Sequence, residues 1–192
     1  MEKAARALTE YVIGKGVIKE ADRYVYEYGF VVVLEIGSFV SFSIFMALYL
    51  NMPIEGIIFF VIFMPLRSYA GGLHLNKFGA CFVLSCLTYV GVLLLVKNIR
   101  ISADVSFVIL LTLEMMVYGL YPVEHVNRKI DKEENEYFKN RLIRFLCMDL
   151  AIGIICLLCN WEIILLEAVL VFVIVVLTMI AGKYKNRYCG RK

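Results

Sequence analysis

Six long apolar runs are the feature of this sequence that most constrains its fold. A helix needs about 20 residues to cross the hydrocarbon core of a bilayer, so six such segments occupy most of a chain of 192 residues. The chain is 61% apolar and 19% charged, whereas soluble domains average about 25% charged residues. We therefore expect an all-α polytopic protein with six transmembrane helices, in which residues 1–192 form a single integral membrane domain. The six runs are Tyr24–Leu50, Ile54–Leu66, Phe78–Val96, Val105–Tyr121, Phe145–Cys159 and Ile163–Ala181.

Composition also excludes several other classes of protein. The net charge of +3 comes without a basic, aromatic-lined face, so we expect no nucleic-acid partner. Residues 1–23 lack the apolar core of a signal peptide, so we expect no cleavable leader. Most of the six cysteines lie inside apolar runs, where thiols usually pack as small apolar groups. We expect no cofactor and no metal, because His74, Cys81 and Cys86 lack a fourth ligand at a usable spacing.

The distribution of positive charge predicts the topology. If all six runs cross, eighteen of the twenty lysines and arginines fall on one side of the membrane, as the cytoplasmic bias of positive charge requires. If the short second run does not cross, the split becomes seven inside and thirteen outside. Six crossings place both termini, segment 67–81 and the charged loop 123–144 in the cytoplasm. Residues 1–22 alternate apolar and charged positions, which predicts an amphipathic helix on the lipid surface.

Segment 67–81 contains the residues best suited to chemistry. A cysteine attacks as its thiolate, and a nearby histidine accepts the proton, so His74 and Cys81 are a candidate nucleophile pair. On a continuous helix, residues seven positions apart are separated by about 10.5 Å along the axis. A contact between them therefore requires a break in the helix between positions 74 and 81, for which Gly79 and the pair Asn76-Lys77 are the candidate positions. Cys81 would then lie in the first turn of the third span, where the helix dipole favours the thiolate.

The same segment resembles the signature of the accessory gene regulator B (AgrB) family, bacterial membrane endopeptidases that process the precursor of a quorum-sensing peptide. Tyr121-Pro122 and the basic residues that follow also resemble this family, whereas Ser68 replaces the second of two arginines that the family often has. The residues that carry the main resemblance are Arg67, Ala70-Gly71-Gly72-Leu73-His74 and Cys81.

This resemblance implies a cysteine endopeptidase that also closes a peptide ring. Cys81 would be the nucleophile and His74 the base. Arg67, Gly71 and Gly72 would stabilise the oxyanion or position the substrate, although Arg67 also fits a role as a membrane-edge anchor. The resemblance further implies a propeptide substrate similar to AgrD, membrane lipid as a partner, and a homodimer. The basic residues expected to dock an acidic propeptide tail are Arg128, Lys129 and Lys132.

Acidic residues inside the apolar runs support a second hypothesis. Intramembrane carboxylates are costly and usually face a protein interior or a water-filled cavity. We expect this of Glu35, Glu114 and Asp149, and Glu35 would line a groove that admits the peptide. Glu35, Asp149 and Asn76 are also candidates for a third catalytic residue if the fold brings one of them to Cys81. The alternative function is a small six-helix transporter or channel that uses these carboxylates.

Overall fold

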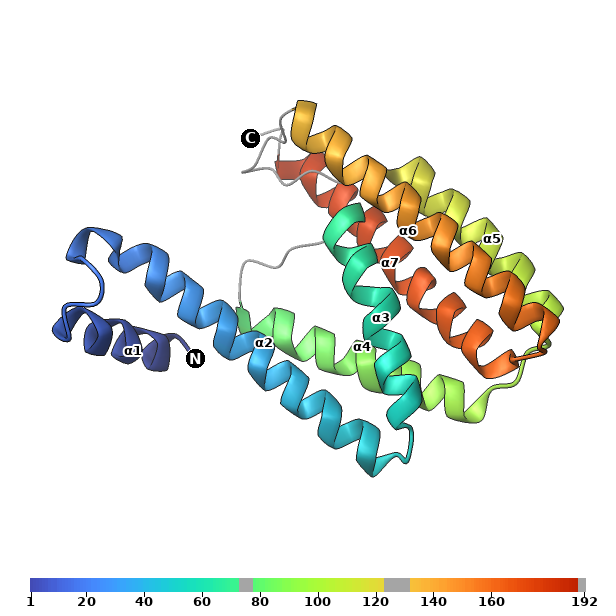
Figure 1. The fold of residues 1–192 in the computed structure, drawn as a ribbon, viewed down its shortest axis with the longest axis horizontal. Coiled ribbons are helices and arrows are strands. Elements are labelled where there is room, and N and C mark those ends of the chain that lie inside the picture. The colour runs from blue at the N-terminus through green and yellow to red at the C-terminus, as the bar shows by residue number, and fades with distance from the viewer. Residues whose placement is uncertain (73–77, 123–131, 190–192) are drawn as a thin grey trace.

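The structure is a computed structural model that describes residues 1–72, 78–122 and 132–189. Within these ranges the chain is helical and contains no β-strand (Figure 1), which confirms the predicted all-α polytopic class. The elements are α1 (Glu2–Gly14), the short 3-10 helix η1 (Glu20–Asp22), α2 (Arg23–Tyr49), α3 (Pro53–Ala70), α4 (Phe78–Asn98), α5 (Ala103–Leu120), α6 (Lys132–Leu158) and α7 (Glu162–Cys189).

Five of the described helices are long and apolar enough to cross a membrane, namely α2, α3, α4, α5 and α7. The chain is therefore a membrane protein. The remaining predicted run lies in the second half of α6, where residues 141–158 still include the charged side chains of Arg141, Arg144 and Asp149. We expected a charged loop throughout 123–144, whereas α6 already begins at Lys132. A sixth crossing by α6, and the side of the membrane on which each loop lies, remain predictions.

Helix α3 is longer than the apolar run from which it was predicted. The run Ile54–Leu66 stops beside Pro65, but the helix continues through this proline to Ala70 and has 18 residues, or about 27 Å. Proline removes one backbone hydrogen bond, which membrane helices tolerate where their neighbours cover the site. Ile62, Leu66 and Ala70 are buried on either side of Pro65 and hold this part of the helix in the bundle. The length of α3 therefore agrees with the predicted crossing.

Helix α7 is the centre of the bundle. It packs against α3, α4, α5 and α6, and Figure 1 shows it between α3 on one side and α5 and α6 on the other. Of the residues in its apolar span, 56% are buried, against 17% in the span of α2. Helix α2 lies at the periphery and packs on α3, α4 and α1. The bundle core is therefore built on α7, while α2 leaves most of its surface uncovered in this chain.

An aromatic cluster joins α2, α3 and α4. The ring of Tyr89 on α4 lies 5.1 Å from the ring of Phe59 and 6.3 Å from that of Phe39, both measured between centroids and both edge-on. Edge-on aromatic pairs at this separation are favourable beyond the area that they bury. The contact between Phe39 and Tyr89 fixes the axial register of α2 against α4. This register determines which residues of the two helices lie opposite each other one and two turns nearer the start of each helix.

Gly56 allows α3 to approach this cluster closely. A Cβ atom at Gly56 would lie 2.5 Å from the Tyr89 hydroxyl oxygen and 3.0 Å from Cβ of Ala47. Tyr89 is fully buried, so its ring has no room to retreat. We expect Gly56→Ala to lower the stability of the protein by about 1–3 kcal/mol through overpacking, measured as a lower Tm in detergent. Gly91→Ala is the control, because no atom lies within 4 Å of that Cβ position. An unchanged Tm for Gly56→Ala would contradict the close approach of α3 and α4.

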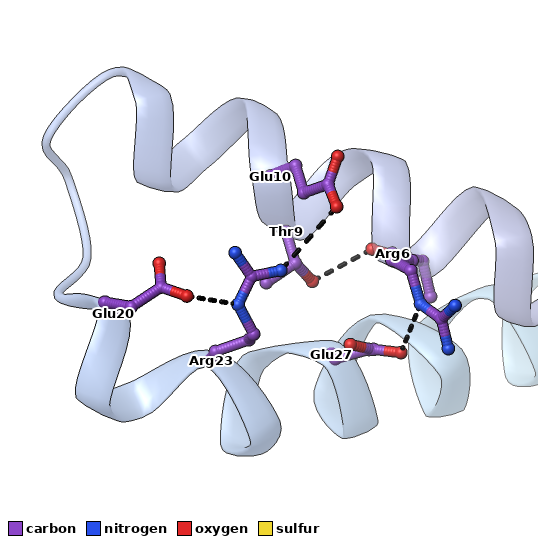
Figure 2. A network of polar contacts seen from close by, with 7 residues as sticks. Arg6, Thr9, Glu10, Glu20, Arg23 and Glu27 are labelled. Atoms are coloured by element: carbon purple, nitrogen blue, oxygen red, sulfur yellow. Dashed lines mark hydrogen bonds and ion pairs between the residues drawn. The ribbon is translucent and has the colours of Figure 1, made fainter.

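Helix α1 lies against the first half of α2 (Figure 1), and Figure 2 shows the polar contacts of this hairpin. Ala5 and Thr9 are fully buried in the contact. Exposed ion pairs contribute about 0–1 kcal/mol each, so this packing holds the hairpin as much as its charges do. Residues 1–22 thus contain the predicted helix, and its contact with lipid remains a prediction. The ion pairs are Arg6–Glu27 at 3.2 Å, Arg23–Glu20 at 2.6 Å and Arg23–Glu10 at 3.7 Å.

Candidate functional site

A glycine pair follows α3. The break expected between positions 74 and 81 is a different feature: Asn76-Lys77 lie outside the described residues, and Gly79 lies within α4. Helix α3 ends at Ala70, and Gly71 and Gly72 follow with φ angles of 79° and 146°. Residues with a side chain rarely adopt positive φ values of this kind, whereas glycine does so without steric cost. The chain therefore leaves the helix axis directly after Ala70, and Gly71 and Gly72 do not continue α3.

Arg67 holds this turn from the last turn of α3. Its Nη1 atom donates a hydrogen bond to the Gly71 carbonyl oxygen at 3.1 Å, and the side chain is partly buried. The guanidinium fills the space beside Gly72, so that a Cβ atom at Gly72 would overlap Nη1 of Arg67. The same Cβ position lies 3.2 Å from the hydroxyl oxygen of Thr178 on α7. Arg67 and Thr178 thus enclose Gly72.

Cys81 lies where the sequence placed it, in the first turn of α4. Its thiol is free and half-buried. Two charged groups are near enough to act on it electrostatically, the guanidinium of Arg67 and the carboxylate of Glu35, and the Ser85 side chain is within hydrogen-bond reach one turn later. A positive charge beside a thiol stabilises the thiolate. The structure thus brings Cys81, Arg67 and Glu35 together from α4, α3 and α2.

The register of α2 against α4 explains why Glu35 reaches this site. The two helices pack together and run in the same direction (Figure 1). Phe39 touches Tyr89, and one turn before this contact lie Glu35 on α2 and Ser85 on α4. Cys81 is one further turn along, about 6 Å in axial distance. Glu35, half-buried on this face, is therefore near the thiol, and its role in lining a peptide groove stays a prediction.

Several predicted site residues fall outside the described part of the chain. His74 belongs to residues 73–77, and Arg128 and Lys129 belong to residues 123–131, which the structure does not describe. Lys132 is the first residue of α6, and its side chain is not described. Asn76, a candidate third catalytic residue, also lies in the first of these gaps. The pairing of His74 with Cys81 and the docking of an acidic tail therefore remain predictions.

The remaining buried acids lie elsewhere in the bundle. Glu114 on α5 and Asp149 on α6 are both buried and lie close enough to act on each other electrostatically. Glu167 on α7 is fully buried, and neither of its oxygens has a hydrogen-bond partner in the described part of the chain. Asp149 is thus close to Glu114, and Glu35 is the acid that the fold brings to Cys81.

Sequence reasoning did not single out Thr178 or Ser85. Thr178 is a hydroxyl side chain in an otherwise apolar stretch of α7, residues 168–181, and it donates a hydrogen bond to the Val175 carbonyl oxygen at 2.8 Å. Its position beside Gly72 depends on the packing of α7 against α3, which no local spacing reveals. In the described residues, no group of three or more His, Cys, Asp or Glu side chains is placed to hold a metal ion.

Fold and site together define a class: a polytopic all-α membrane protein with a thiol at the start of a span, next to a glycine turn held by an arginine. The model of the accessory gene regulator B (AgrB) family matches residues 3–181, and the chain belongs to this family. This confirms the resemblance that the sequence motifs indicated and assigns the protein a role in processing quorum-sensing peptides. No curated protein and no solved structure matches the chain.

Proposed function

We propose that this protein is a membrane cysteine endopeptidase that cleaves the C-terminal part of a quorum-sensing propeptide and cyclises the remainder. The observation that carries the proposal is the placement of Cys81. Its free, half-buried thiol lies in the first turn of α4, near the Arg67 guanidinium that holds the glycine turn. A helix N-terminus and the Arg67 cation favour the thiolate, which is the nucleophilic form, whereas burial and the Glu35 carboxylate oppose it, so the reaction needs a base such as His74.

In the first step, the Cys81 thiolate attacks the scissile carbonyl carbon of the propeptide. His74, assigned by family resemblance, accepts the thiol proton and passes it to the leaving nitrogen. A bond forms between Sγ of Cys81 and the carbonyl carbon, and the carbon–nitrogen bond breaks. The products are a thioester on Cys81 and a C-terminal fragment with a new amino group.

In the second step, a cysteine or serine inside the bound acyl peptide attacks the thioester. The new bond closes a thiolactone or lactone ring, and the sulfur of Cys81 leaves with the proton that the attacking group gave up. The thioester is itself an activated acyl group, so ring closure needs no ATP. A site that excludes water favours this internal nucleophile over hydrolysis.

Arg67 and the glycine turn supply the electrostatic environment for both steps. Each tetrahedral intermediate carries an oxyanion, which preorganised donors or a fixed cation stabilise. The bond to Gly71 holds the guanidinium next to the turn, so its charge is in place before the substrate arrives. The backbone N–H groups of Gly71 and Gly72 are further candidate donors.

The proposal extends to the membrane side and the partners. The catalytic segment and both termini lie in the cytoplasm, as the distribution of positive charge predicts. Arg128, Lys129 and Lys132 dock the acidic tail of the propeptide, and the protein acts as a homodimer. These assignments rest on the family resemblance and on charge, and a propeptide made in the cytoplasm would meet the site on this side.

The decisive experiment is capture of the acyl intermediate. Protein purified from the cells that produce it would be digested at acidic pH, and Cys81 would be searched by mass spectrometry for an attached peptide. We expect an adduct that neutral hydroxylamine removes, as it does a thioester, and no such adduct on Cys86. Absence of an adduct, together with ion flux in vesicles that Asp149→Asn abolishes, would contradict the proposal and favour the transporter.

A further inference from the structure

Two groups of opposite charge flank the Cys81 thiol from different helices. Arg67 reaches it from α3 and Glu35 from α2. The position of Arg67 is fixed by its bond to the Gly71 carbonyl oxygen, and that of Glu35 by the contact between Phe39 and Tyr89 one turn farther along the same two helices. The site therefore presents a cation from α3 and a carboxylate from α2 to the same thiol.

A carboxylate at position 35, inside a membrane-spanning helix, is energetically costly, so its presence there needs an explanation. Glu35 lies 13 residues into the 27-residue helix α2, and charged side chains within a span are retained where they meet a partner or do a task. A carboxylate beside Cys81 also opposes formation of the thiolate by like-charge repulsion. Glu35 is thus unfavourable for the nucleophile alone, and its benefit must come from another reacting group.

The cleavage reaction provides such a group. When the peptide bond breaks, its nitrogen becomes the α-amino group of the departing fragment, and such groups have a pKa of about 7.7–8.0 and carry a positive charge at neutral pH. The carbonyl oxygen becomes negative in the tetrahedral intermediate. Oxygen and nitrogen lie on different sides of the carbon under attack, so a site with one cationic and one anionic side is complementary to both.

We propose that Glu35 binds the α-amino group of the C-terminal fragment as it leaves. The inference rests on the proposed function and adds the direction in which the propeptide lies across Cys81. The scissile carbonyl oxygen points to Arg67 and α3, and the leaving nitrogen points to Glu35 and α2. The proton that leaves the Cys81 thiol ends on this nitrogen and gives the neutral amine. A second proton, taken from solvent at neutral pH, converts the amine to the ammonium that pairs with the Glu35 carboxylate.

The reverse of fragment release gives the test, because an amine that attacks the Cys81 thioester must occupy the position of the leaving nitrogen. Purified protein in detergent would be loaded at Cys81 with a short peptide thioester. Two acceptors would then be compared by mass spectrometry: glycinamide, which gives an amide, and N-acetylcysteamine, which gives a new thioester. We expect Glu35→Gln to raise the glycinamide concentration needed for half-maximal transfer by about ten- to a hundredfold, the usual effect of losing a charged hydrogen bond. Transfer to N-acetylcysteamine, which has no ammonium group, should stay within about twofold of wild type.

The matched control is Glu27→Gln, which removes the same charge from the same helix at a residue that pairs with Arg6. It should leave both acceptors unaffected. A second measurement needs no variant: in the wild-type protein, N-acetylglycinamide lacks the ammonium and should not compete with glycinamide. Equal effects of Glu35→Gln on the two acceptors, an unchanged response to glycinamide, or competition by N-acetylglycinamide would overturn the assignment of Glu35. Failure of Cys81 to accept the peptide would instead contradict the proposed function.

Discussion

Replacement of Cys81 by alanine is expected to abolish release of the C-terminal fragment from the propeptide, with a loss on the order of 10⁴-fold or more. Removal of a covalent nucleophile has effects of this size, because the remaining groups cannot form the acyl intermediate. The protein should still fold and insert, since the Cys81 side chain is half-buried and its truncation leaves a small gap. Fragment release would be measured by mass spectrometry in cells that produce both the protein and its propeptide.

The control for this prediction is Cys86→Ala. Cys86 lies five residues farther along α4, and its thiol is also free and half-buried, so the two variants change the helix in comparable ways. We expect Cys86→Ala to process the propeptide at close to the wild-type rate. Processing by Cys81→Ala, or an equal loss in both variants, would show that the thiol of Cys81 is not the nucleophile.

Hydrophobic patterning predicted the helices well where each was bounded by polar residues. The third and fourth runs agree with α4 and α5 to within two residues at each end. Helix α6 starts thirteen residues before the fifth run. The run is shorter than the helix because a hydropathy pattern detects only the apolar part of a helix. Glutamate and lysine are good helix formers, and Glu133 and Glu134 lie in the first turn, where the helix dipole favours negative charge. Charged sequence of this kind extends a helix beyond its apolar part.

The functional site was predictable only in part. Cys81 was visible from its residue type and its place at the start of a span, but the break was expected between positions 74 and 81, not directly after α3 at Gly71 and Gly72. The bond from Arg67 to the Gly71 carbonyl oxygen was not visible, because it depends on the exact path of the turn. Thr178 is more than a hundred residues from Gly72 in sequence, and it reaches the turn only through the packing of α7 against α3. Such contacts follow from tertiary structure and have no local pattern.

Replacement of Gly72 by alanine is expected to damage the site through geometry alone, while the Cys81 nucleophile stays in the chain. The φ angle of 146° is rarely adopted by residues with a Cβ atom, and such strain costs about 1–3 kcal/mol. The added atom would overlap the guanidinium of Arg67, which must then leave its bond with Gly71 and withdraw its charge from Cys81. We expect processing to fall about 10–100-fold, since each 1.36 kcal/mol corresponds to a factor of ten in rate. Alkylation of Cys81 by iodoacetamide, followed by mass spectrometry, should slow in parallel.

Two comparisons separate this mechanism from a general loss of stability. Gly79→Ala adds the same methyl group near the start of α4, where no atom lies within 4 Å, and it should leave both processing and alkylation close to wild type. Arg67→Ala removes the group with which the new Cβ atom collides. If displacement of Arg67 causes the damage, Gly72→Ala will add little further loss in the Arg67→Ala background, because the two changes act on one interaction. Fully additive losses would show that backbone strain at Gly72, and not the position of the Arg67 charge, controls the reactivity of Cys81.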